Sequence, residues 1–213
     1  MSDLMCNKCL ICYGELADGE ADYHASCLKK FYGRPVAPVM PYSRDNISEL
    51  ALTVIRNSMT VTGVQPKLSL DIDRGGRNRQ GKLTIVGLWG RYILKPQSDI
   101  YSSMPELEDV TMKMARASGI KTAEHALIRM SDGELAYITR RMDRGKDGTK
   151  YSMLDLCQLS NRLTEHKYRG SYSQLSDTVR TYSSLSLIDV QRFWSIVLFS
   201  WMTGNSDMHC KNF

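Results

Sequence analysis

An apolar segment followed at once by a polar loop limits most strongly how this chain can fold. Residues 193–202, FWSIVLFSWM, place apolar side chains on more than one face of a helix, which is typical of a helix covered on several sides. We therefore expect this helix at the centre of a helical unit. The following residues, TGNSDMHCKNF, are mostly polar or charged and place four residues between Asp207 and Asn212. Taken alone, this segment is most simply a polar loop that caps a buried helix.

The composition is that of a chain with a substantial hydrophobic core. Its 213 residues are 42% hydrophobic, which suits one or two globular domains and argues against disorder. The net charge of +5 is compatible with phosphate or nucleic-acid binding but is common among ordinary soluble proteins. No charged-then-apolar signal segment opens the chain, and the apolar run at 196–199 is far shorter than the ~18 residues of a membrane span. We therefore expect a cytoplasmic protein with no membrane partner.

Four cysteines and one histidine lie close together near the start of the chain. They are Cys6, Cys9, Cys12, His24 and Cys27. Cys9 and Cys12 are separated by two residues and are followed by Gly14, as in a metal knuckle, and His24 and Cys27 would complete a tetrahedral site. Three thiolates and one imidazole suit zinc in a structural role. The first cysteine of the cluster is an alternative ligand, and the thiols could instead be reduced and buried.

The middle of the chain alternates between predicted strands and helices. Residues 29–47 contain three prolines and read as a linker. Helical spacing predicts one helix over residues 46–57 and another that begins at Met104 and ends at Gly119. We expect the second helix to carry an apolar face of Leu107, Val110, Met114 and Ala117. Strands are predicted near residues 68–72, 83–87, 91–96, 123–130 and 134–142.

Several charged residues fall on this outline in the order that kinases use. Lys95 ends an apolar strand, where it either snorkels or pairs. Glu108 flanks the apolar face of the next helix and could reach that lysine, although most helix glutamates are solvated. A strand lysine and a helix glutamate form the ion pair by which kinases direct an ammonium at nucleotide phosphates. Asp207 and Asn212 also have the spacing of a kinase catalytic loop.

These segments together resemble the HipA family of bacterial serine/threonine kinases, the toxins of toxin–antitoxin pairs. The resemblance runs from about residue 57 to residue 213 and is carried by TVTGVQPKLSL, ILKP, ELEDVTMKMARASGI, ITRRMDR and GNSDMHCKNF. It implies an α+β, protein-kinase-like fold of two lobes. The N-lobe, with a mixed sheet, would span residues 41–142, and the helical C-lobe would begin at residue 143 and end in the catalytic loop. The Cys/His module and its linker would occupy residues 1–40.

The resemblance also implies roles for individual residues. Lys95 and Glu108 would bind the nucleotide, Met142 and Asp143 would form the hinge and contact ribose, and Asn212 would hold magnesium. Asp207 would be the catalytic aspartate, with Lys211 beside it in the catalytic loop. The family autophosphorylates in its Gly-rich loop, here at Thr60, with Thr62 as a second candidate. The nucleotide-binding residues of this loop would be Thr60, Thr62, Gly63, Val64, Gln65 and Lys67.

The implied function is an ATP- and magnesium-dependent protein kinase. An aminoacyl-tRNA synthetase is the candidate substrate and a HipB-like DNA-binding antitoxin the candidate partner. The chain departs from the family twice: the Cys/His module replaces a β-rich subdomain, and the second metal-binding aspartate is absent before Phe213. We therefore expect a kinase portion with feeble turnover, in which Asn212 lies at a frayed end. The alternative is a non-catalytic module that binds an antitoxin or a nucleotide.

Overall fold

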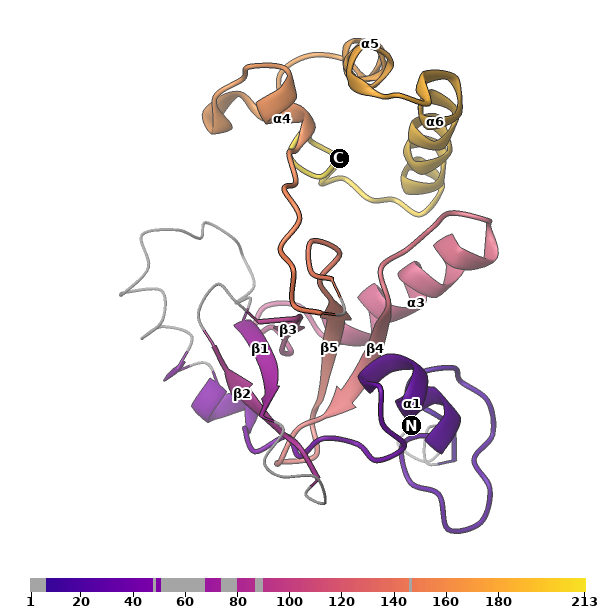
Figure 1. Ribbon diagram of the computed structural model, residues 1–213, viewed down its shortest axis with the longest axis vertical. Helices are drawn as coiled ribbons and strands as arrows, with labels where there is room; N and C mark the ends of the chain where they lie inside the picture. Colours follow the sequence, from indigo (N-terminus) through magenta and orange to yellow (C-terminus); the bar gives the residue numbers. More distant parts are fainter. Residues whose placement is uncertain (1–6, 48, 51–67, 74–79, 87–89, 146) are drawn as a thin grey trace. The chain divides into compact units, whose positions relative to one another are not determined.

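The computed structural model describes residues 7–213 except 48, 51–67, 74–79, 87–89 and 146. The chain forms two compact units (Figure 1). Residues 1–112 and 123–148 form the first, here called the sheet unit, and residues 113–122 and 149–213 form the second, the helical unit. Each unit has its own cluster of buried apolar side chains.

The sheet unit is built on five antiparallel strands in the order β2-β1-β3-β5-β4. Leu68, Leu70 and Ile72 are buried while the residues between them are partly exposed, so the predicted alternation is confirmed. A left-handed Gly133, with φ of +90°, allows the tight turn between the last two strands. The strands are β1 Leu68–Asp73, β2 Lys82–Ile85, β3 Tyr92–Lys95, β4 His125–Arg129 and β5 Leu135–Arg140.

The segment that contains the Cys/His cluster packs on the edge strand β4. Helix α1, Ala25–Tyr32, begins after His24 at its N-cap and ends at Gly33, whose φ is +78°. In Figure 1 it lies beside β4. The Tyr23 hydroxyl donates to the Leu127 carbonyl at 3.1 Å, and the Leu127 N–H donates to the Leu10 carbonyl at 3.1 Å. The core that this segment shares with the sheet contains Leu28, Phe31, Tyr32, Ile47, Leu68, Leu70, Ile72, Leu83, Tyr92, Leu94, Ala126, Ile128, Met130, Ala136 and Ile138.

The two helices predicted within residues 46–119 compare differently with the structure. Of the helix expected over residues 46–57, the structure describes helical residues up to position 50, and the remainder lies outside the described residues. Helix α3, Met104–Ala117, has the expected bounds, but the expected apolar face does not face the interior. Leu107 is 55% exposed and Met114 43% exposed, whereas Asp109 is completely buried. A carboxylate therefore anchors the inward face, which a search for apolar spacing does not detect.

Besides the C-terminal end of α3, the helical unit contains three α-helices among its described residues. They are α4 Leu156–Leu159, α5 Tyr172–Tyr182 and α6 Ser186–Met202, with a short 3₁₀ helix at Thr164–His166. Its core consists of Leu156, Cys157, Leu175, Phe193 and Cys210. No helix in the described part of the chain is long and apolar enough to cross a membrane.

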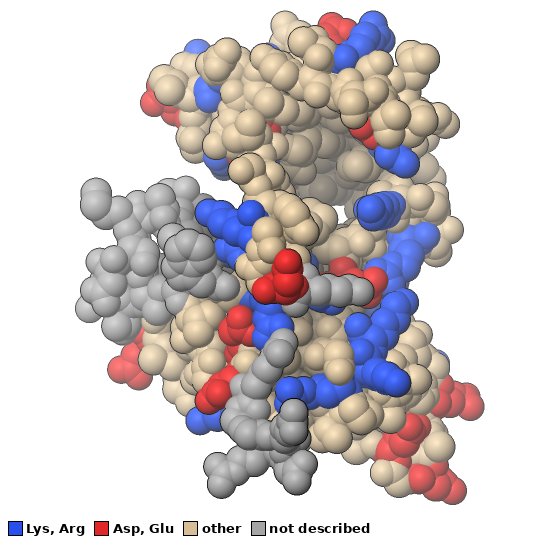
Figure 2. Space-filling model, in the orientation of Figure 1, with Lys and Arg blue, Asp and Glu red and all other residues tan. Residues whose placement is uncertain are grey.

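The expectation that α6 lies at the centre of this unit is wrong. Only Phe193 and Ser200 of this helix are buried, and Trp201 is 76% exposed. The helix packs one face against α5, and its remaining apolar side chains stay exposed. In Figure 2, uncharged residues predominate on the visible face of the helical unit, with charged residues scattered among them.

Candidate functional site

Lys95 and Glu108 form an ion pair that joins the sheet to helix α3. Lys95 is the last residue of β3, and its Nζ donates a hydrogen bond to Glu108 Oε1. The two side chains are 21% and 26% exposed. Nζ also lies 5.5 Å from the ring centroid of Tyr137, the residue opposite Lys95 in the β3–β5 register, within the range of a cation–π interaction. Of the alternatives left by the sequence, the structure therefore shows pairing.

A buried polar network lies next to this pair. Asp109 follows Glu108 on α3, and its two oxygens contact different elements. The Tyr13 hydroxyl donates to Oδ2 at 2.5 Å, and His125 Nδ1 of β4 lies 2.7 Å from Oδ1. The His125 ring stacks on Tyr137 with centroids 5.8 Å apart. Burial and the neighbouring Asp109 carboxylate raise the pKa of Tyr13 above its ordinary value, so this hydroxyl remains a donor at neutral pH.

The sequence did not identify this network as part of a site. Aspartates and histidines are mostly exposed or partly buried in proteins, so composition and spacing treat Asp109 and His125 as surface residues. The available signal was weak: Asp109 lies four positions after Pro105, which is also buried, on the helix face opposite the apolar residues. Only the fold brings Tyr13 to the same place.

The predicted hinge residues differ in exposure. Met142 is 71% exposed. Asp143 is 8% exposed and lies between Arg141, which donates two hydrogen bonds at 2.8 Å, and Arg144, which donates one at 2.6 Å. Hydrogen bonds from Arg141, together with the charge of Arg144, lower the pKa of Asp143 to about 2, although burial acts in the opposite direction. A hydrogen bond from the backbone of Asp143 itself also lowers this pKa, so the carboxylate is held from several sides.

The predicted phosphate loop lies outside the described residues. This applies to all of its predicted members, namely Thr60, Thr62, Gly63, Val64, Gln65 and Lys67.

Asp207 and Asn212 contact each other in the loop after α6. The Asn212 amide donates to the Asp207 carbonyl at 2.6 Å and to its carboxylate at 3.3 Å. The Tyr168 hydroxyl donates to the same carboxylate at 3.0 Å, and His209 Nε2 lies 3.5 Å from it. The Asp207 side chain is 66% exposed. The loop therefore holds its aspartate by three neighbours and keeps it accessible.

The expectation that Asn212 lies at a frayed end is wrong. Leu156 N–H donates to the Phe213 carbonyl at 3.0 Å, and the Phe213 ring lies 5.0 Å from that of Phe193 in the core. Lys211, predicted beside the catalytic aspartate, forms an ion pair of 3.2 Å with Asp155 at the start of α4. These contacts fix the loop against α4 and α6.

The structure thus divides the predicted site residues between the two units. Lys95, Glu108, Met142 and Asp143 belong to the sheet unit, and Asp207, Lys211 and Asn212 belong to the helical unit.

The four predicted metal ligands come together in the sheet unit. The ligand atoms of Cys9, Cys12, His24 and Cys27 all lie within 4.8 Å of one another. Cys6, the alternative ligand, lies outside the described residues. Burial raises the pKa of Cys9, but hydrogen bonds from backbone groups of neighbouring residues lower it to about 7. Burial, and then the contact with Cys12, raise the pKa of Cys27 to about 12.

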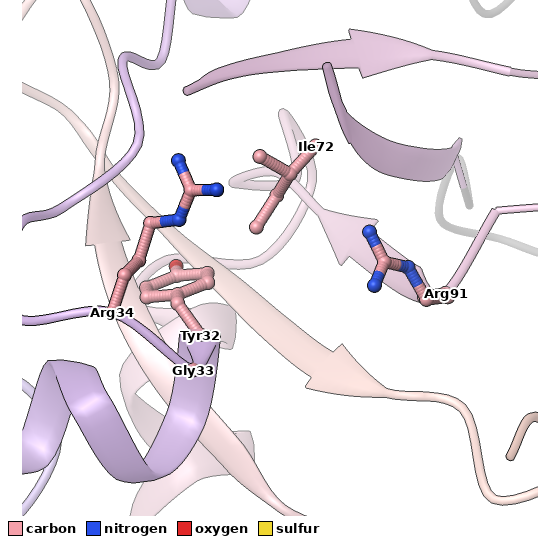
Figure 3. Close-up of a pocket in the computed structure, with 5 residues that line it drawn as sticks. All are labelled: Tyr32, Gly33, Arg34, Ile72 and Arg91. Carbon is pink, nitrogen blue, oxygen red and sulfur yellow. The ribbon is translucent and has the colours of Figure 1, made fainter. Parts of the chain in front are cut away.

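A pocket of about 190 Å³ opens elsewhere in the sheet unit. Figure 3 shows Tyr32 and Arg34, at the end of α1, facing Ile72 of β1 and Arg91 before β3. Arg91 donates a hydrogen bond of 2.8 Å to Asp71. None of the predicted nucleotide-binding residues lines this pocket, and we assign it no part in the site.

The sheet unit has five antiparallel strands, and its β3 lysine pairs with the helix that follows. Together with the helical unit, these features define a kinase-like α+β fold. The HipA-like C-terminal domain family matches residues 59–213. The chain belongs to this family. A solved structure with a similar fold is that of the HipA, HipB and operator DNA complex of Shewanella oneidensis MR-1. The similarity has a TM-score of 0.54 at 19% identity and covers 93% of this chain and 49% of the other.

Curated relatives carry kinase names. A protein of Haemophilus influenzae named "Putative kinase" is 25% identical over 83% of this chain and 52% of the relative. "Putative kinase Y4dM" of Sinorhizobium fredii is 33% identical over 72% of this chain and 39% of the relative. The chain therefore spans about half the length of these relatives or less.

Proposed function

We propose that this chain forms the nucleotide-binding part and the catalytic loop of an ATP-dependent serine/threonine kinase of the HipA type. The Lys95–Glu108 ion pair carries the proposal. It joins the third strand of the sheet to the helix that follows, as in kinases, where the glutamate holds the lysine toward nucleotide phosphates. Membership of the HipA-like family and relatives with kinase names support the same activity.

The described residues suit the remaining parts of the reaction. Asp207 is exposed and held from three directions, so it could orient a substrate hydroxyl and accept its proton. Both hydrogen bonds of Asn212 to Asp207 use the amide nitrogen, which leaves the amide oxygen to ligate magnesium. Magnesium, when bound, would neutralise charge on the phosphates. Asp143 is the residue that we propose to contact a ribose hydroxyl.

Substrate and partner follow from the family alone. We propose a cytosolic protein substrate, with an aminoacyl-tRNA synthetase as the candidate, and autophosphorylation at Thr60 or Thr62. The structure from Shewanella oneidensis holds HipA together with HipB and operator DNA, and a HipB-like antitoxin is the partner that we propose here.

Substitution of Lys95 tests the nucleotide site. Lys95→Ala should weaken ATP binding, measured by calorimetry, roughly tenfold or more, because a hydrogen bond between charged groups is lost from a partly enclosed site. Lys82→Ala is the matched control, since Lys82 is an exposed lysine on β2 of the same sheet, and it should leave ATP affinity unchanged. If the two substitutions weakened ATP binding equally, Lys95 would have no specific part in the nucleotide site.

The kinase proposal and the binding-module alternative separate at Asp207. In a kinase, Asp207→Ala should abolish transfer of labelled phosphate from ATP to protein while sparing ATP binding, because this residue acts on the substrate hydroxyl. ATP binding with no phosphate transfer by the unsubstituted protein would favour the non-catalytic module.

A further inference from the structure

The Cys/His cluster is close to the dimensions of a tetrahedral zinc site, since its four ligand atoms lie within 4.8 Å of one another. Zinc lies about 2.3 Å from a thiolate and about 2.0–2.1 Å from an imidazole nitrogen, so ligand atoms at tetrahedral angles are roughly 3.5–3.8 Å apart. His24 Nδ1 is 3.3 Å from Cys12 Sγ and 3.8 Å from Cys27 Sγ. Together with Cys9, the protein supplies four ligands and leaves no position open, as in structural zinc sites.

The surroundings of the cluster orient its ligands as in a metal knuckle. Backbone N–H groups of Gly14 and His24 donate to Cys12 Sγ at 3.4 Å and to Cys9 Sγ at 3.5 Å. His24 Nε2 lies 2.8 Å from the Glu15 carbonyl, a contact that fixes the ring with Nδ1 toward the sulfurs of Cys12 and Cys27. A Cβ at Gly14 would lie 3.3 Å from the His24 ring and 3.4 Å from Cys12 Sγ, so the turn packs closely around its ligands.

The same turn directs Tyr13 into the sheet unit. Tyr13 directly follows the ligand Cys12 and has a φ of +63°, a conformation that non-glycine residues keep only when their surroundings enforce it. Its N–H donates to the Cys9 carbonyl at 2.8 Å. Its hydroxyl donates to Asp109, which is 96 residues away in the sequence.

Asp109 connects the knuckle to the helix that carries Glu108. Its other oxygen contacts His125 of β4, so two fixed groups hold one face of α3. His125 stacks on Tyr137, and the Tyr137 ring faces Lys95. The contacts therefore run from the knuckle to both members of the Lys95–Glu108 pair.

We infer that Cys9, Cys12, His24 and Cys27 bind zinc, and that the resulting knuckle positions α3 and its Glu108 through Tyr13 and Asp109. Tyr13 and Asp109 are positioning residues, since they act through Glu108. The part of this inference that concerns nucleotide rests on the proposed kinase function. The zinc site and the control of α3 do not.

Metal analysis tests the first half of the inference. Protein purified without chelator should contain about one equivalent of zinc, and Cys12→Ser should lower that content severalfold because one thiolate is lost. Zinc well below one equivalent after growth and purification with added zinc would overturn the site.

Hydrogen exchange of α3 tests the second half. Tyr13→Phe removes one hydroxyl and no ligand, so zinc content should stay near one equivalent. Amides of residues 104–112 should nevertheless exchange roughly tenfold faster or more, because a hydrogen bond to a buried charged acceptor is lost. Tyr23→Phe is the matched control, since the Tyr23 hydroxyl also ties this segment to the sheet but contacts β4. It should leave α3 exchange unchanged, and equal effects of both variants would overturn the role of Tyr13.

A chelator completes the experiment. Removing zinc from the unsubstituted protein should accelerate α3 exchange about as much as Tyr13→Phe does, and removing it from the variant should add little, because both act through the same contact. Fully additive effects would overturn the coupling.

ATP affinity, measured in the same samples, should fall as the protection of α3 from exchange falls. Faster α3 exchange in a protein that binds no ATP would leave this inference intact and refute the kinase proposal instead.

Discussion

Asp143 shows how the surroundings of one residue change its chemistry. Its carboxylate accepts hydrogen bonds from Arg141 and Arg144, and its side chain is only 9% exposed. Such a group is stabilised in its charged form by both arginines, which outweigh the effect of burial on its pKa. The carboxylate therefore contributes to the stability of the sheet unit, in whose last segment, residues 123–148, it lies.

The lowered pKa predicts acid sensitivity at this residue. The folded-state pKa of about 2 lies below the ordinary value of 3.8. The stabilisation is therefore complete above about pH 4 and is lost as the pH falls toward 2. The difference corresponds to about 2 kcal/mol. Urea unfolding should show that Asp143→Asn removes most of this loss of stability between pH 5 and pH 2.5.

A surface aspartate provides the comparison for that measurement. Asp177 is 71% exposed and lies 4.0 Å from Arg180, and exposed pairs contribute little to stability. Asp177→Asn should therefore leave the pH dependence of unfolding nearly unchanged. An equal change in both variants would contradict the assignment to Asp143.

Individual site residues could be predicted only where a pattern was specific. Lys95 and Glu108 stood at the positions that a kinase requires, and the fold pairs them. The ligand set was recognisable because Cys9 and Cys12 have knuckle spacing and the fold gathers all four ligands. Asp109 could not be found, because its burial depends on Tyr13 and on a distant strand.

At the scale of elements, the start of α4 illustrates how one side chain serves two structures. Asp155 is the N-cap of α4, where Oδ1 accepts the Gln158 N–H at 2.8 Å, and Oδ2 pairs with Lys211 of the loop after α6. The cap satisfies an N–H that would otherwise lack a helical partner. The short helix and the loop that carries Asp207 thus depend on the same carboxylate.

Two substitutions separate these functions of Asp155. Asp155→Ala should lower the free energy of unfolding by about 1–2 kcal/mol, because both the cap and the ion pair are lost. Asp155→Asn keeps a good capping residue and loses only the charge, so it should cost less than about 1 kcal/mol. Chemical denaturation measures both values. Equal losses would mean that the ion pair with Lys211, and not the cap, holds this region.

Elements were predictable to different degrees for a physical reason. Strands with one buried face show alternation, and β1 has the expected pattern. The inward face of α3 carries Asp109, and α6 leaves much of its apolar surface exposed. The spacing of apolar residues indicates which face of a helix carries them, but the burial of that face also depends on which elements the fold places against it.

At the scale of the whole molecule, the two units have cores that share no residue. The sheet unit packs Leu70 and its neighbours against α1, and the helical unit packs Phe193 against Leu175 and Cys210. Each cluster is continuous within one unit. A cavity in one core should therefore act first on the stability of that unit.

Large-to-small substitutions in each core test this independence. Phe193→Ala should destabilise the helical unit by about 3–5 kcal/mol and Leu70→Ala the sheet unit by about 2–5 kcal/mol. Hydrogen exchange should show lost protection confined to the unit that carries the substitution. Similar loss of protection in both units from either variant would indicate a single cooperative structure.

The contacts of the N-terminal segment also bear on the order of folding during synthesis. All four cysteine and histidine ligands lie within residues 9–27, so this loop can close before the residues that follow it are synthesised. Its contacts with α3 and β4 span 96 residues of sequence at Tyr13–Asp109 and 107 residues at Asp22–Arg129. At ribosomal rates of about 5–20 residues per second, the partners arrive on the order of 5–20 s later. A metal ion bound early would keep Tyr13 in its turn during that interval. When α3 leaves the ribosome, Asp109 could then bind a Tyr13 hydroxyl that is already in position.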